Sequence, residues 1–110
     1  MIQNEASAKK ICKDCPIART AQLIGDTWSL LIIRDLFSGP KRFGELASSL
    51  AGVSSRTLTK KLQLLESHHI ISREEYSEKP PRVEYSLTKK GKELNTLIDD
   101  LRLFGEKYKK

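Results

Sequence analysis

The stretch SSRTLTKKLQLLE, residues 54–66, decides the fold of this chain. At 100° per residue, Leu58, Leu62 and Leu65 fall within about 60° of one another on a helix. Arg56 and Lys60 point to the opposite side. The stretch therefore predicts a helix that packs its leucines onto a core and presents hydrogen-bond donors outward.

Two helices are predicted between Pro16 and Pro40. The first begins at Pro16, which is tolerated at the first helical position, and ends at Gly25. The second begins after Asp26, a good N-cap residue, and stops at Gly39. This second helix has apolar residues on nearly all sides, so it is expected to be almost fully surrounded by the rest of the fold.

A short third helix, at residues 42–50, is expected to lead into the opening stretch through a tight turn. Gly52 permits a positive φ in that turn, and Ser54 is predicted to cap the next helix. The spacing of the two helices, joined by so short a connector, is typical of a helix-turn-helix.

The hydrophobic period changes after the two adjacent histidines, His68 and His69. Residues 82–88, RVEYSLT, alternate between apolar and polar side chains, which predicts a half-buried strand. Residues 70–77 form its expected partner, and the prolines of the EKPP tip stiffen the connection. Thr88 is then predicted to cap one last helix, in which apolar residues recur every three or four positions.

This order of elements predicts a winged helix-turn-helix, a mainly α fold with a β-hairpin wing. We divide the chain into a flexible arm at residues 1–14, a DNA-binding domain at 15–88 and a dimerisation helix at 89–110. In this fold the second helix of the helix-turn-helix enters a DNA major groove and the hairpin reaches the adjacent backbone or minor groove.

Length and charge agree with this interpretation. The chain has 110 residues, a net charge of +6 and a pI near 9.4, so a polyanion is the expected partner, either nucleic acid or an anionic membrane surface. No apolar run approaches the roughly 20 residues of a membrane span, and no secretory signal precedes the fold, so a cytoplasmic protein is expected. No motif for catalysis or cofactor binding is present, and we predict neither an enzyme nor a cofactor.

Candidate DNA contacts lie on three segments. Arginine and lysine neutralise phosphates, arginine can also bind guanine edges, and short hydroxyls can meet phosphates. The wing has four acids, so its contribution to DNA binding depends on which side chains face the duplex. For every candidate cation the alternative interpretation is a solvated surface charge without a DNA contact. On the helix the candidates are Ser54, Ser55, Arg56, Thr57, Thr59, Lys60, Lys61 and Gln63; elsewhere they are Lys79, Arg82, Lys41 and Arg42.

Cys12 and Cys15 form a C-x-x-C pair. No second pair completes a zinc site, and the motif does not follow a strand as in a thioredoxin, so we predict no metal. Cys15 precedes Pro16 at an expected helix start, where free N–H groups, the helix dipole and the nearby Lys13 favour a thiolate. A reactive thiol, a disulfide with Cys12 and a small buried packing thiol all remain open.

The chain closely resembles the HxlR-type winged-helix transcription regulators, relatives of the MarR group, over residues 15–100. The motifs that carry this resemblance are Cys15-Pro16, Gly25-Asp26-Thr27-Trp28, Gly39-Pro40-Lys41-Arg42-Phe43 with Glu45-Leu46, and Pro81-Arg82-Val83-Glu84-Tyr85-Ser86-Leu87-Thr88. The resemblance implies a cytoplasmic homodimer, joined by its first and last helices, that binds an operator. It also implies that the cysteine of the Cys-Pro pair senses electrophiles or oxidants; Cys12 departs from the common pattern.

The predicted dimer contacts combine this implication with the apolar seam of the last helix: Ile17, Leu94, Leu97, Ile98, Leu101, Phe104 and Tyr108. A twofold dimer would read half-sites one helical turn apart, so a palindromic operator is expected. The effector would be an oxidant or another small molecule. The alternative function is a winged-helix module that binds a protein in a transcription assembly and has no operator of its own, and a weaker one is binding to a membrane surface through the lysine-rich ends.

Overall fold

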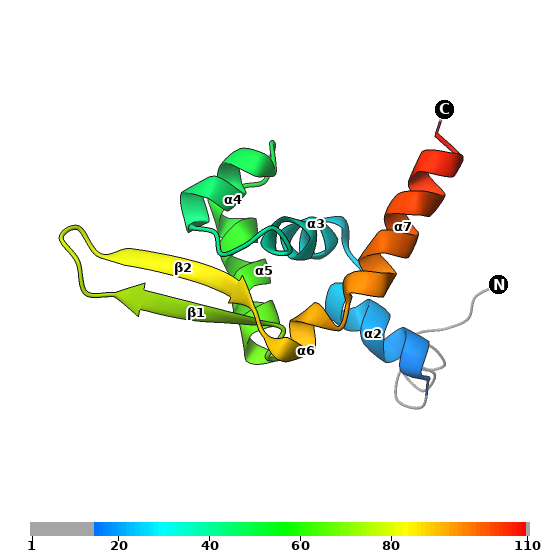
Figure 1. The fold of residues 1–110 in the computed structure, drawn as a ribbon, viewed down its shortest axis with the longest axis horizontal. Helices are drawn as coiled ribbons and strands as arrows, with labels where there is room; N and C mark the ends of the chain where they lie inside the picture. The colour runs from blue at the N-terminus through cyan, green and yellow to red at the C-terminus, as the bar shows by residue number, and fades with distance from the viewer. Residues whose placement is uncertain (1–14, 110) are drawn as a thin grey trace.

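The fold is that of a winged helix-turn-helix (Figure 1). The computed structural model describes residues 15–109, so the predicted arm at 1–14 and Cys12 lie outside the described residues. The elements are α2 (Pro16–Ile24), α3 (Thr27–Leu36), α4 (Phe43–Ser49), α5 (Ser55–Ser67), β1 (Ile71–Tyr76), β2 (Arg82–Leu87), α6 (Lys89–Lys92) and α7 (Asn95–Lys107). Their order confirms the predicted fold class.

The core lies where α3 meets α4, α5 and the base of the hairpin. Ile32 and Ile33 of α3 are fully buried, and Leu58, Leu62 and Leu65 of α5 pack into the same cluster. Removing one such leucine side chain costs about 2 to 5 kcal/mol. The predicted division of α5 into an inner leucine side and an outer polar side is therefore confirmed.

The predicted helix caps are confirmed at three positions. The backbone N–H of Ser29 donates to the Asp26 carboxylate (3.1 Å), and that of Thr57 donates to the Ser54 hydroxyl (3.0 Å). The Thr88 hydroxyl accepts from Gly91 N–H (3.0 Å). Because each cap satisfies an N–H group that the helix itself leaves unpaired, these residues set where the helices begin.

The prediction of one helix from Thr88 to the chain end was wrong, because this segment forms two helices. Thr88 caps only α6, a single turn without an apolar stripe, and the chain turns at Leu94 into α7. The turn is held against Ile70, the residue before β1, since Thr88 N–H donates to the Ile70 carbonyl (3.0 Å) and Gly91 is buried beside that same carbonyl. Tertiary contacts with Ile70 thus interrupt a continuous helical pattern.

A second expectation, that the helix after Asp26 is surrounded almost completely, fails at its end. Helix α3 stops at Leu36, and Phe37 is 37% exposed. Trp28, Leu30 and Leu31 are only partly buried against the core. Helix α3 thus has less protein over it than the sequence pattern indicated.

The wing, residues 71–87, is an antiparallel pair of strands that extends away from α2 and α7 (Figure 1). Its register pairs Ile71 with Leu87 at the base and Tyr76 with Arg82 near the tip. Lys41 adds one further bridge, with both backbone hydrogen bonds to Tyr85 (2.9 and 2.8 Å), which the sequence had not indicated. The Lys79–Pro80 peptide bond at the tip is cis.

The alternation predicted for residues 82–88 is only partly seen in their burial. Leu87 is buried, but the five preceding residues of β2 are all half-buried, on both faces of the hairpin. The outer face is covered because Arg82 lies across it and contacts neighbouring side chains. A polar contact thus produces burial where the pattern predicted a solvated side.

Candidate nucleic-acid interface

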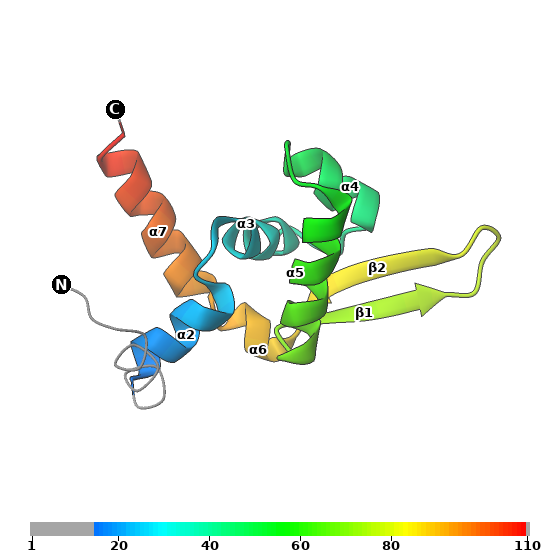
Figure 2. The ribbon, with the colours of Figure 1, turned by 180° about the vertical axis from the view of Figure 1, so that it is seen from behind.

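Helix α5 presents a cationic outer side. Arg56, Thr59, Lys60 and Gln63 are exposed, whereas Leu58, Leu62 and Leu65 of the same helix are buried. The reverse view in Figure 2 places α5 on the near side of the molecule, in front of the base of the wing. The helix is therefore fixed by its inner side and leaves two cations and two hydrogen-bonding side chains to a partner.

Lys61 takes a different position from Lys60. Its ammonium group lies 3.3 Å from the Asp26 carboxylate, and its side chain is 28% exposed. Burial disfavours the charged form of Asp26, but hydrogen bonds from Ser29 and Lys61 and the charge of Lys61 outweigh burial, so the pKa of Asp26 lies below its usual value. Lys61 thus joins α5 to the start of α3.

The hydroxyl residues at the start of α5 are also unequal. Ser55 is exposed, Thr57 is half-buried, and the Ser54 hydroxyl accepts the capping hydrogen bond. A shallow concavity of about 620 Å³ follows one side of the helix. Its lining residues are Thr57, Lys60, Lys61, Gln63, Leu64 and Ser67.

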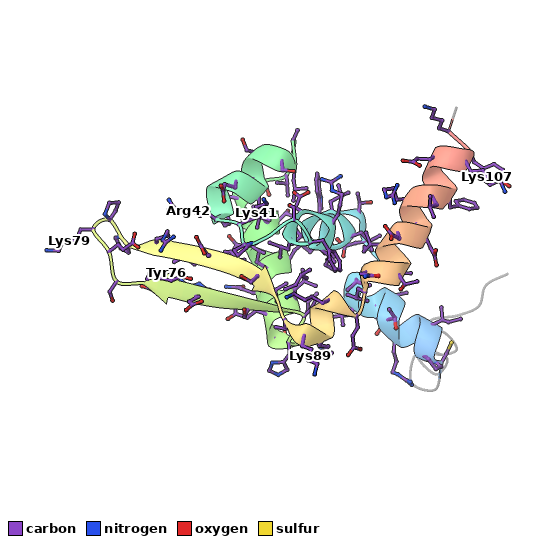
Figure 3. All side chains as sticks on the ribbon, in the orientation of Figure 1. Lys41, Arg42, Tyr76, Lys79, Lys89 and Lys107 are labelled. Atoms are coloured by element: carbon purple, nitrogen blue, oxygen red, sulfur yellow. The ribbon has the colours of Figure 1, made fainter. Side chains whose placement is uncertain are left out.

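The two cations before α4 lie beside the wing (Figure 3). Arg42 is exposed, and its backbone N–H donates to the Glu45 carboxylate (2.8 Å). Lys41 is half-buried and is fixed to Tyr85 through its backbone. Arg42 is thus held at a helix start with its side chain facing solvent.

The two wing cations differ most. Lys79 is exposed and points outward from the hairpin tip (Figure 3). Arg82 instead forms ion pairs with Glu78 (2.9 Å) and Glu84 (3.0 Å), and its guanidinium lies 4.0 Å from the centre of the Tyr76 ring. From the sequence both cations were predicted to contact DNA, because the alternation of apolar and polar residues does not show which side chain lies between two carboxylates.

Cys15 is the residue before α2 and carries a free, half-buried thiol. Its side chain makes no capping hydrogen bond, while its carbonyl accepts from Arg19 N–H (3.0 Å). Cys12 lies outside the described residues, so the predicted pairing of the two cysteines is not described by the structure. Within residues 15–109, no three histidine, cysteine or acidic side chains cluster to hold a metal ion.

The predicted dimer residues separate into two groups. Leu94 and Ile98 pack against the core of their own subunit. The others form what we call the apolar face, which lines or adjoins a hollow of about 490 Å³ between α2 and α7. The apolar face consists of Ile17, Leu97, Leu101, Phe104 and Tyr108, all exposed.

Leu30 of α3 also lines this hollow, although the sequence had assigned it to the core. Only the angle between α2, α3 and α7 brings it there, so no sequence signal could have found it. None of the described helices is both long enough and apolar enough to cross a lipid bilayer.

Comparison with known proteins gives a consistent result. The model of the HxlR-like helix-turn-helix family matches residues 23–110. A protein of Synechocystis sp. named as an HTH-type transcriptional regulator is 44% identical over 94 residues, covering 86% of this chain and 70% of the relative.

Two solved structures also resemble this chain in fold. The redox regulator HypR in its oxidised form has a TM-score of 0.84 at 34% identity, over 87% of this chain and 99% of HypR. The reduced transcriptional regulator YodB from B. subtilis has a TM-score of 0.75 at 33% identity, over 87% and 95%. The fold, the outward cations of α5 and the family match agree with one another. The chain therefore belongs to the HxlR-like helix-turn-helix family of transcriptional regulators.

Proposed function

We propose that this transcriptional regulator binds double-stranded DNA sequence-specifically as a homodimer, with α5 as the recognition helix in a major groove. The observation that carries the proposal is the two-sided burial of α5. Arg56 and Lys60 are exposed while three leucines of that helix, Leu58, Leu62 and Leu65, are buried. Such a helix can enter a groove without leaving the core, because its cations meet phosphates or base edges from the opposite side.

Arg42 and Lys79 extend the proposed surface from α5 toward the wing. Both are exposed, and both lie on the side of the fold that carries the wing (Figure 3). Each would neutralise one phosphate and thereby release counterions, which raises affinity without sequence preference. These contacts would set the position of the recognition helix, and Arg56 would read bases.

The apolar face supports the homodimer. Phe104 of α7 is 67% exposed and Ile17 of α2 is 80% exposed, and these two helices lie at the end of the molecule away from the wing (Figure 1). Exposed apolar side chains in this number mark a contact surface. A second copy joined there would place the two recognition helices about 34 Å apart on one side of a duplex, so the operator would be an imperfect palindrome.

The dimer can be tested on one helix. Leu101→Asp with Phe104→Asp should shift the protein from dimer to monomer in analytical ultracentrifugation. Leu103 is the matched control, because it is 54% exposed on α7 but lies roughly 130° around the helix from the apolar face. Leu103→Asp should leave the dimer intact, and a wild-type protein that sediments as a monomer at micromolar concentration would refute this part of the proposal.

DNA binding is tested by salt dependence. Wild-type protein and the Arg56→Ala, Lys60→Ala double variant are titrated by fluorescence anisotropy against a duplex containing the promoter of the protein's own gene. Loss of a phosphate contact of Lys60 should lower the magnitude of the slope of log K against log salt by about 0.9 and raise Kd about eightfold at 0.1 M salt. Loss of the base contact of Arg56 should weaken binding by about a further 1 to 3 kcal/mol per protomer.

The matched control replaces Lys89 and Lys92, two exposed lysines of α6, with alanine. This variant has the same net charge as the test variant and should bind nearly as well as wild type. If the test variant also keeps its affinity, the outer side of α5 does not bind DNA and the protein-interaction alternative is favoured. A nuclease footprint without a dyad would contradict the palindromic operator.

Oxidant sensing through Cys15 is a further part of the proposal. Its thiol is free and half-buried at the start of α2, the helix that carries Ile17 of the apolar face. A modification there would alter the dimer contact and so the spacing of the recognition helices. Diamide should release wild-type protein from DNA but not Cys15→Ser, and an equal release of both proteins would clear Cys15 of the role.

A further inference from the structure

We propose that Arg82 is a positioning residue of the wing, which holds the hairpin tip so that Lys79 meets DNA, and that Arg82 itself contacts no phosphate or base. The inference rests on the proposed DNA-binding function. It goes beyond that function by assigning different roles to the two wing cations.

The guanidinium of Arg82 is engaged on three sides. Nη2 lies 2.9 Å from a Glu78 oxygen, and Nη1 lies 3.0 Å from a Glu84 oxygen. The guanidinium carbon is 4.0 Å from the centre of the Tyr76 ring, a distance at which the cation is attracted to the ring face. To reach a phosphate, Arg82 would have to leave two carboxylates and an aromatic ring.

The strand register explains why a cation is needed at this position. Glu74 and Glu84 are directly opposite one another, and like charges in opposed positions destabilise a strand pair. Tyr76 and Arg82 form the next pair on the same face, and the Tyr76 hydroxyl donates to Glu74 (3.2 Å). Arg82 therefore neutralises Glu84 and joins the two strands where repulsion would part them.

Arg82 also closes the tip. The ion pair with Glu78 spans residues 78–82, and Lys79 lies inside that loop. The backbone N–H of Glu78 further donates to the Tyr76 carbonyl (2.9 Å), so the loop is attached at both ends. Loss of the Arg82 contacts would free the loop that carries Lys79 from the strands.

The charges of the wing leave Lys79 as its contact to DNA. The wing holds four acids and three cations. Two of those cations are paired with acids, Arg82 as described and Arg73 with Glu75 (3.5 Å). Lys79 forms no ion pair or hydrogen bond with any residue between 15 and 109, and it points away from the tip (Figure 3). A wing with this balance repels phosphate along its length and attracts it at the tip.

The test is a double-mutant cycle of Lys79→Ala and Arg82→Gln, measured by anisotropy on a 30-base-pair mixed-sequence duplex between 50 and 200 mM KCl. Lys79→Ala should raise Kd about eightfold per wing at 0.1 M salt and lower the salt slope by about 0.9. Arg82→Gln should also weaken binding in the wild-type background. In the Lys79→Ala background it should change neither Kd nor slope, because the contact it supports is already gone.

Other outcomes overturn the inference in distinguishable ways. A further eightfold loss and a further slope change of about 0.9 in the double variant would show that Arg82 binds its own phosphate. If Arg82→Gln lowers DNA affinity equally in both backgrounds and also lowers the melting temperature, the role of Arg82 is purely structural. If it lowers affinity in neither background, Arg82 has no role in DNA binding. Wild-type protein that does not bind the duplex would instead refute the proposed function.

Arg73→Gln is the matched control, because Arg73 is a wing arginine paired with an acid but lies on the face opposite Arg82. Whatever its own effect on Kd, it should combine additively with Lys79→Ala. A coupling between Arg73 and Lys79 as large as that of Arg82 would mean that any loss of a wing ion pair disturbs the tip, and the specific role of Arg82 would be wrong.

Discussion

Gly91→Ala is the substitution whose cost can be worked most directly from the structure. An added Cβ would lie 2.1 Å from the Ile70 carbonyl oxygen and 3.0 Å from a Leu87 methyl group, so α6 and Ile70, the residue before β1, would have to separate by more than about 1 Å. Overpacking of this kind costs about 1 to 3 kcal/mol. The same carbonyl accepts from Thr88 N–H (3.0 Å), and weakening that hydrogen bond adds about 1 kcal/mol.

Alanine returns up to about 1 kcal/mol because it is the better helix former, so we expect a net loss of about 2 kcal/mol in the free energy of unfolding. For a domain of this size that loss lowers the melting temperature by about 10 °C. The measurement is circular dichroism at 222 nm during heating, with all variants at one protein concentration because self-association would shift the transition.

Gly44→Ala provides the matched control. Gly44 lies in α4, and a Cβ there would meet no atom within 4 Å. Its melting temperature should equal or slightly exceed that of wild type. If Gly91→Ala melts at or above wild type as well, the close approach of α6 to Ile70 does not hold the wing to the helices and does not cause the break between α6 and α7.

Four further substitutions test the packing and electrostatics of the fold. Asp26→Ala should lower the free energy of unfolding by about 1 kcal/mol at pH 7 through loss of the α3 cap. Because the folded-state pKa of Asp26 lies below its usual 3.8, the stabilisation is complete above that pH and is lost as the pH falls through the lowered value. Urea titrations should therefore show the gap between the wild type and Asp26→Ala narrowing as the pH falls through the lowered pKa of Asp26, and a gap that stays as wide as at pH 7 would contradict the ionic contribution. Ser29→Ala should keep or raise stability by up to about 1 kcal/mol, since the buried hydroxyl has no hydrogen-bond partner in the described structure; a clear loss would reveal one. Leu62→Ala should cost about 3 kcal/mol in the same titrations, whereas Leu64→Ala, at a 37% exposed position of the same helix, should cost less than 1 kcal/mol.

The elements and their starting points were predictable from the sequence because both depend on neighbouring residues. The i, i+4, i+7 spacing of Leu58, Leu62 and Leu65 indicates which side of α5 is buried. Asp26 and Ser54 cap helices that begin within three residues of them. Such signals are complete within a few positions, so no knowledge of the rest of the chain is needed.

Which side of α5 faces outward was predictable for the same reason. The roles of the individual cations on that side were not. Arg56 and Lys60 are exposed where the helical wheel placed them. Lys61 is one position further along but reaches Asp26, 35 residues earlier in the chain, across the contact between α5 and α3. The spacing of residues within α5 gives no information about where Asp26 lies in the folded protein.

The sequence by itself determined the helices from α2 to α5, the two strands and the side of α5 that faces the core, because hydrophobic spacing and caps are local properties. Tertiary structure alone decided which of the other charges remain available to a partner and where the last helix breaks. Arg82 lies between Glu78 and Glu84 over the Tyr76 ring, and Gly91 of α6 meets the Ile70 carbonyl. The physical reason is that an ion pair or a close backbone approach depends on strand register and on the angles between elements, which are fixed only when the whole core has packed.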